Sequence, residues 1–146
     1  KLGLTNTRFS LVILYTTMSI AFSTIILRGF FQRIPASLEE AAMIDGCSRI
    51  SSLFRIVIPV MLPGIASTFI FAFVQNWNEL FYAVMFIDTN AFKTLPVGMN
   101  SFVLKFDIDW GSMSAGTVVS VVPTVIMFAF AQRYIVEGLT QGAEKG

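Results

Sequence analysis

The feature that most constrains the fold is an uncharged apolar run near the start of the chain. From Phe9 to Leu27 the sequence carries no charged residue, and Arg8 and Arg28 flank the run. An α-helix needs about 20 such residues to cross the roughly 30 Å of hydrocarbon in a bilayer. The run therefore predicts a membrane-spanning helix over residues 9–27.

The composition extends this prediction to the whole chain. Of its 146 residues, 55% are hydrophobic and only 13% are charged, about half the charged fraction of a typical soluble domain. The net charge of +1 comes from scattered Lys and Arg residues, which form no basic patch for nucleic acid. We therefore predict an all-α integral membrane protein that contacts lipid and binds no nucleic acid.

The residue types that common catalytic and metal sites need are missing from the sequence. It contains no histidine, its single cysteine is Cys47, and it has no G-x-x-x-x-G-K-[ST] motif. Zinc sites need several histidine or cysteine residues, and histidine-based triads need a histidine. Nucleotide-binding loops need the glycine-rich motif. The sequence thus predicts no catalytic residue, no metal site and no bound cofactor, and it assigns any use of ATP to a partner.

Two later segments predict further spans, over about residues 60–87 and 112–131. The first is longer than one span requires and contains the polar residues Gln75, Asn78 and Glu79. A helix that starts near Pro63 would place Glu79 about 24 Å along its axis. Because a carboxylate inside a membrane is costly, Glu79 is either a pathway residue or an interfacial residue that water reaches. We expect one helical face to carry Gly64, Thr68, Gln75 and Glu79.

Small residues recur at helical spacing in the first and third spans. The two stripes are Thr16, Ser19 and Ser23, and Gly116, Ser120 and Thr124. Small residues allow close helix contact in lipid, so packing explains both stripes. For the hydroxyls of the first stripe, and for those of Thr117, Ser120 and Thr124 in the third span, hydrogen bonding to a translocated solute is the alternative. The predicted pathway residues are therefore Gln75, Asn78, Glu79, Ser19 and Ser120.

The loop between the first two spans, residues 28–57, carries a fixed pattern of charged and small residues. Ser37 precedes Glu40 by three positions, the spacing of a capping box that would start a short helix over about residues 38–44. Gly46 then allows a turn with positive φ, and a second helical run leads back to the membrane. A helix, a tight turn and a helix form a surface that suits docking to another protein. The pattern, which ends just beyond the loop, comprises Glu40, Ala41, Ala42, Asp45, Gly46, Ile56 and Pro59.

The distribution of positive charge predicts which side of the membrane each connection occupies. Cytoplasmic connections carry an excess of Lys and Arg, and here the excess favours the loop 28–57 and the tail 132–146. Residues 88–111 are then an external loop, and Trp110 suits the membrane interface. The charges compared are Arg28, Arg33, Arg49, Arg55, Arg133 and Lys145 against Lys1, Arg8, Lys93 and Lys105.

The loop pattern resembles the E-A-A signature of permease subunits of binding-protein-dependent ABC importers, E-A-A-x-x-x-G followed after nine residues by I-x-L-P. All of its fixed positions match except that Ile58 replaces the leucine, a conservative change. Glu144 stands where the family more often has an apolar residue. The resemblance to carbohydrate-type permeases rests on Trp77-Asn78-Glu79, Leu95-Pro96-Val97-Gly98, Gln132-Arg133-Tyr134 and Gly138-Leu139-Thr140.

This resemblance implies a permease subunit in a bacterial or archaeal cytoplasmic (inner) membrane, with the last three of six spans present here. Since the chain begins at Lys1 without methionine, we expect it to be the C-terminal part of a longer protein. The implied partners are two ATPase subunits that use ATP and Mg, a second permease subunit and an external solute-binding protein. The implied function is inward transport of a sugar or related polar solute, with the E-A-A loop forming coupling helices that sit in a cleft of the ATPase. In this interpretation Glu40 pairs with an arginine across the interface, and Ala41 and Ala42 allow close approach.

Other functions remain open from the residues alone. An ion-coupled secondary transporter or channel would use Glu79 to bind a proton or cation, but it leaves the loop pattern unexplained. An amphipathic helix lying on lipid would need a large basic-flanked apolar face. An intramembrane enzyme lacks nucleophile and base partners in this chain.

Overall fold

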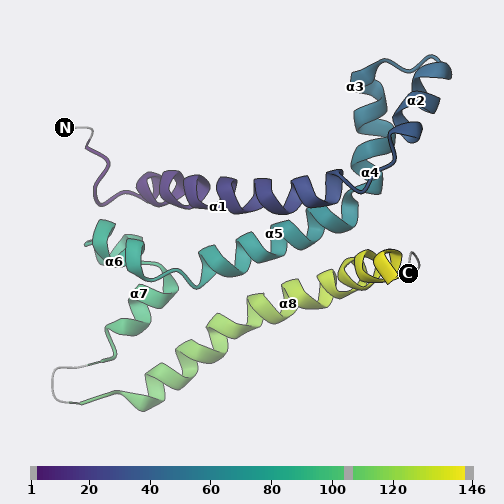
Figure 1. The fold of residues 1–146 in the computed structure, drawn as a ribbon. Helices are drawn as coiled ribbons and strands as arrows, with labels where there is room; N and C mark the ends of the chain where they lie inside the picture. Colours follow the sequence, from purple (N-terminus) through teal and green to yellow (C-terminus); the bar gives the residue numbers. More distant parts are fainter. Residues whose placement is uncertain (1–2, 104–106, 144–146) are drawn as a thin grey trace. The chain divides into compact units, whose positions relative to one another are not determined.

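The computed structural model describes residues 3–103 and 107–143, with side chains described up to residue 132. This part of the chain is helical, and its only β-structure is an isolated bridge between Val103 and Ile108, so the all-α prediction is confirmed (Figure 1). The α-helices are α1 (Arg8–Phe31), α2 (Ala36–Ile44), α3 (Arg49–Ser52), α4 (Ile58–Val60), α5 (Leu62–Trp77), α6 (Phe81–Phe86), α7 (Leu95–Asn100) and α8 (Trp110–Ala143). A π-helical turn, η1 (Leu53–Val57), and a 3₁₀ turn, η2 (Asn90–Phe92), complete the set.

Two helices are long and apolar enough to cross a membrane by themselves. They are α1 and the part of α8 from Trp110 to Gln132. A third span is possible in length and composition if Arg49–Val60 and Leu62–Trp77, bent by 70°, count as one broken helix. The predicted spans 9–27 and 112–131 lie within α1 and α8, and their boundaries in a bilayer stay predictions.

The second predicted span, residues 60–87, is not one continuous helix. Helix α5 ends at Trp77, and α6 begins at Phe81. At this ending the backbone N–H of Asn78, at 3.2 Å, and its side-chain amide, at 2.8 Å, both donate to the carbonyl oxygen of Val74. The N–H of Glu79 donates to the carbonyl oxygen of Asn76 at 3.4 Å, a spacing of three residues at which the α-helical pattern stops. Glu79 therefore lies beyond α5, and the predicted shared face is wrong at this residue.

The helix that contains the third predicted span, α8, continues beyond residue 131 and ends at Ala143. The polar tail predicted from residue 132 is thus helical for most of its length. No proline follows Pro123 in the sequence, so the backbone hydrogen bonding of the helix can continue. Some residues named in the charge comparison and in the family resemblance lie outside the described residues. These are Lys1, Lys105, Glu144 and Lys145, and the side chains from Arg133 onward are not described either.

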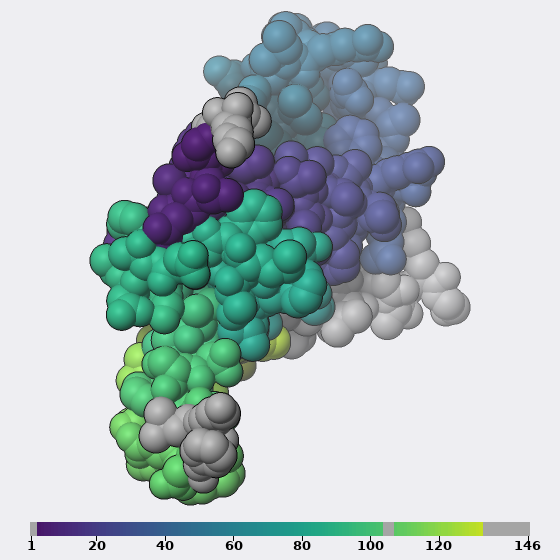
Figure 2. Space-filling model, turned by 90° about the vertical axis from the view of Figure 1, so that its left-hand side faces the viewer, coloured from purple at the N-terminus to yellow at the C-terminus, as the bar shows by residue number. Residues whose placement is uncertain are grey.

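The described helices divide into two compact units, the first comprising Lys1–Ile20 and Ala72–Ala129. Its buried apolar core consists of Leu11, Ala83, Ile87 and Val97, which brings α1, α6 and α7 together. The N-terminal residues lie against the segment that follows α6 (Figure 2). Asn6 joins them, since its N–H donates to the carbonyl oxygen of Phe86 at 2.8 Å and its side chain contacts residues 88 and 89.

The second unit comprises Ala21–Phe71 and Phe130–Gly146. In it the end of α1 packs on the start of α5, where Phe30 covers Gly64. A Cβ atom added to Gly64 would overlap the Phe30 ring. The absence of a side chain at Gly64 thus permits this helix crossing.

Candidate functional site

The first candidate site is the elbow, which we define as residues 35–52, containing α2, the turn and α3. Helix α2 begins after Pro35, whose φ of −63° and ψ of 132° place it at the N-cap without a side-chain hydrogen bond. Ser37 lies inside the helix, so the predicted capping box with Glu40 is wrong. Proline fixes φ near the helical value and lacks the N–H that a cap would satisfy, so the helix starts before Ser37.

The predicted turn is present at Gly46, which has a φ of +87°. The N–H of Gly46 donates to the carbonyl oxygen of Met43 at 3.1 Å, and that of Cys47 donates to Ala42 at 3.0 Å. These two bonds form a Schellman motif, which satisfies the last carbonyls of α2. Asp45 is the C-cap residue of the helix. A positive φ is unfavourable for residues with a Cβ atom, which explains glycine here.

The second half of the elbow leads directly into a distorted helix. Ser48 caps α3 by accepting from the N–H of Ser51 at 3.3 Å. The helix then widens into the π-turn η1, which contains Ile56, and passes through α4, which contains Pro59. The 70° bend follows before Leu62. π-helical turns are rare and often occur at functional positions. The π-turn and the bend together connect the elbow to α5.

The outer surface of the elbow combines apolar and acidic residues. Helix α2 packs against α3 and η1 through Ala42, which is only 3% exposed. Ile44 is 86% exposed and Ile50 is 72% exposed. Glu40 is also exposed, and no hydrogen bond or ion pair within the described part of the chain engages its carboxylate. Large exposed apolar side chains mark a candidate contact surface for another molecule.

The second candidate site is the junction, which we define as residues 76–79, between α5 and α6. Its first two side chains bond to two different helices. The Asn76 amide donates to Ser19 Oγ of α1 at 2.9 Å. The indole N–H of Trp77 donates to the carbonyl oxygen of Ser120 in α8 at 3.0 Å. The junction thus connects α5 to the helices on which the two predicted small-residue stripes lie.

Glu79 connects the junction to α1 and α6. Its Oε2 atom accepts from the Tyr15 hydroxyl at 2.9 Å and from the N–H of Ala83 at 3.1 Å. Its Oε1 atom accepts from the N–H of Tyr82 at 2.8 Å. All three donors are neutral, and two of them are N–H groups in the first turn of α6. The carboxylate is half-buried and occupied by the protein itself.

The structure divides the predicted pathway residues into two groups. Gln75 and Asn78 have exposed side chains. Glu79, Ser19 and Ser120 are half-buried and take part in the hydrogen bonds of the junction. A role in a solute pathway stays a prediction for all five residues.

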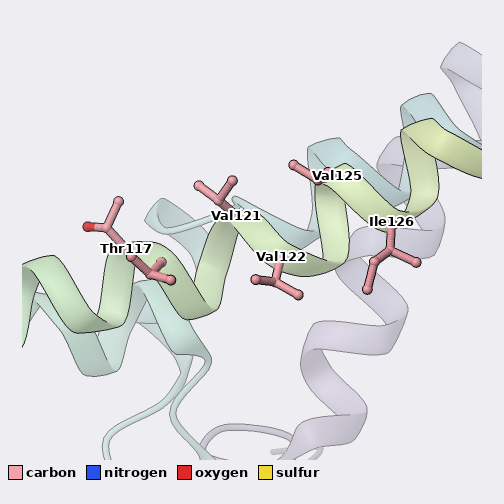
Figure 3. A pocket seen from close by; sticks show the side chains of 6 residues that line it. Thr117, Val121, Val122, Val125 and Ile126 are labelled. Carbon is pink, nitrogen blue, oxygen red and sulfur yellow. The ribbon is translucent and has the colours of Figure 1, made fainter.

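Helix α8 presents an open apolar groove along one side (Figure 3). Its lining is purely aliphatic apart from one threonine and consists of Thr117, Val118, Val121, Val122, Val125 and Ile126. The small-residue stripe of α8, Gly116, Ser120 and Thr124, is half-buried, whereas the groove residues are exposed. A Cβ atom at Gly116 would lie 3.1 Å from Met99 Cγ. Packing therefore accounts for Gly116, as the small-residue pattern suggested.

Two important residues escaped the sequence analysis, Tyr15 and Asn6. Tyr15 is a phenol within an apolar span, and buried tyrosine hydroxyls usually find a hydrogen-bond partner, so its position was a usable signal. Asn6 has a φ of +60°, and no sequence pattern indicated that it would bind residues after α6.

Comparison with known proteins gives consistent matches along the chain. A family profile described as "Binding-protein-dependent transport system inner membrane component" matches residues 2–140. The sulfoquinovosyl glycerol transport system permease protein SmoH of Agrobacterium fabrum is 42% identical over 145 residues, covering 99% of this chain and 51% of that protein. The trehalose/maltose transport system permease protein MalG of Thermococcus litoralis is 42% identical over 147 residues, covering 100% of this chain and 53% of that protein.

A solved structure is similar as well. The crystal structure of a bacterial ABC transporter involved in the import of the acidic polysaccharide alginate matches with a TM-score of 0.64 and 25% identity. The match covers 79% of this chain and 46% of that chain. The chain thus spans about half the length of the relatives it matches.

Proposed function

Because the chain belongs to the family of binding-protein-dependent transport system inner membrane components, we propose that it is a permease subunit of an ATP-driven importer. The single observation that carries this proposal is the family match over residues 2–140. The family is one of transport proteins, not enzymes. The solute class that we propose is a sugar or related polar solute, since relatives are named for transport of trehalose, maltose and sulfoquinovosyl glycerol.

The elbow is the proposed contact with an ATPase subunit. Its turn has a defined conformation, because two backbone hydrogen bonds close it around the positive φ of Gly46. Ile44 and Ile50 supply exposed apolar area, and Glu40 supplies a free carboxylate for an arginine. A surface of this kind can transmit a movement of its partner through η1 and α4 to α5.

The proposed assembly contains two ATPase subunits, a second permease subunit and an external solute-binding protein in a bacterial or archaeal inner membrane. ATP and Mg would bind to the ATPase subunits, and the solute would be delivered from the external side. In this arrangement Gln75 and Asn78, which are exposed, are the proposed pathway residues with side chains available to a solute.

Charge reversal at Glu40 tests this function in the full-length protein. Co-purification of the unchanged protein with an ATPase and a second permease is the first requirement. Glu40→Lys should then lower solute-stimulated ATP hydrolysis at least tenfold, because loss of a buried interfacial ion pair costs about 2–5 kcal/mol. Membrane insertion should be unchanged.

Asp88→Lys is the matched control, since Asp88 is an exposed acidic residue on the side predicted to be external. It should retain stimulated hydrolysis. Normal coupling in Glu40→Lys would contradict the proposed docking. Uptake in ATP-free vesicles that depends only on an ion gradient would instead favour a secondary transporter.

A further inference from the structure

Glu79 makes an unusual set of contacts for a carboxylate in a membrane protein. Its two oxygens accept three hydrogen bonds, one from Tyr15 of α1 and two from the N–H groups of Tyr82 and Ala83 in α6. These hydrogen bonds therefore link α1 and α6, which are far apart in the sequence. A solute would have to displace at least one of these donors to bind the same oxygens.

The bonds to α6 have a clear physical reason. This helix has only six residues, Phe81–Phe86, and the first N–H groups of any helix lack partners within it. Ala83 is 0% exposed, so water does not reach it, and an unpaired N–H there would be destabilising. The Glu79 carboxylate supplies the missing acceptor, which would also make the break between α5 and α6 tolerable if the predicted span 60–87 lies in a membrane.

The Tyr15 bond adds a connection that capping alone does not require. It lies beside the apolar core of Leu11, Ala83, Ile87 and Val97, to which Tyr15 itself is packed. The same core residues lie on α1, α6 and α7. Hydrogen bond and core together hold α6 in one position relative to the first half of α1.

We propose that Glu79 and Tyr15 form a positioning pair, in which the Glu79 carboxylate fixes α6 to α1 and thereby sets the conformation of the break after α5. Glu79 does not bind the solute. The pair acts through Asn78, the adjacent exposed residue, whose placement depends on where α5 ends and α6 begins. This role rests on the proposed transport function, but the pairing itself can be tested without transport.

Hydrogen–deuterium exchange of the full-length protein in lipid nanodiscs tests the pairing. In Glu79→Gln one of the two acceptor oxygens becomes an NH₂ group, which cannot accept from a backbone N–H, so at least one of the bonds to α6 or Tyr15 is lost. Exchange in the peptide covering α6 should then be about tenfold faster or more. Tyr15→Phe keeps the carboxylate and should raise exchange there several-fold. In a double variant with Glu79→Ala, Tyr15→Phe should add nothing to Glu79→Ala, since the side chain that accepts from the Tyr15 hydroxyl is absent. Tyr82→Phe keeps the backbone N–H that donates to Glu79 and removes only the side-chain hydroxyl, so it should match the unchanged protein.

Transport kinetics distinguish positioning from solute binding. Glu79→Gln and Tyr15→Phe should both lower kcat for solute uptake, with KM for the solute within about twofold of the unchanged protein. If Glu79→Gln fails to assemble, Tyr15→Phe alone carries both measurements. An increase in KM for Glu79→Gln without faster exchange in α6 would overturn the proposal, and so would a Tyr15→Phe protein that is unchanged in both assays. If the unchanged protein shows no ATP-driven uptake, the proposed function fails while the exchange result still decides the pairing.

Discussion

Substitution of Gly46 by alanine should open the elbow locally. The residue has a φ of +87°, and no atom lies within 4 Å of where a Cβ atom would be placed. The cost is therefore backbone strain without a steric clash, about 1–2 kcal/mol for a residue with a Cβ atom in this conformation. Such a change shifts a local opening equilibrium by roughly 5- to 30-fold. Amide exchange at Cys47, whose N–H closes the turn, should become faster by that factor in the full-length protein.

Gly29 provides the matched control for this prediction. It lies within α1, also has no atom within 4 Å of an added Cβ, and does not have a positive φ. Gly29→Ala should therefore leave exchange at Cys47 unchanged and stabilise α1 by about 0.5–1 kcal/mol. Gly46→Asn should fall between Gly46→Ala and the unchanged protein, because asparagine tolerates this conformation better. Equal exchange in Gly46→Ala and Gly29→Ala would refute the strain explanation.

Three further predictions concern stability. Gly64→Ala should destabilise the protein by about 1–3 kcal/mol through overlap with Phe30, and the loss in melting temperature should be smaller when Phe30→Ala is combined with it. Ser52→Ala should leave the melting temperature unchanged or raise it, by up to about 1 kcal/mol of stability, because the Ser52 hydroxyl is buried and has no hydrogen-bond partner among the described residues. Hydrogen bonding from Ser112 lowers the pKa of Asp109. The ionised Asp109 therefore stabilises the folded protein fully at pH values above the ordinary aspartate pKa of about 3.9. This stabilisation should be lost as the pH falls through the lower pKa of the folded state. Asp109→Asn should remove that acid dependence from the melting curve.

Much of the elbow was predictable because its determinants are local. Gly46 follows a short helical pattern, and the chain reversal there needs only the conformational freedom of one residue. The start of α2 was predicted less well. Pro35 and Ser37 both signal a helix start, and the proline decided the outcome.

The junction was not predictable in the same way. The polar residues near Glu79 are visible in the sequence, but the break after Trp77 depends on partners that are distant along the chain. Tyr15 in α1 and Ser120 in α8 supply those partners. Periodicity describes how one helix continues, and it contains no information about which other helix can compensate an interruption.

The Schellman turn of the elbow also has a consequence for biosynthesis. Its closing hydrogen bonds join residues only a few positions apart, Met43 with Gly46 and Ala42 with Cys47. Contacts so close in sequence form quickly and need no distant segment. The turn can therefore close once these residues have left the ribosome, without waiting for α8, the last helix in the described part of the chain. The backbone conformation of the turn then does not depend on the last span.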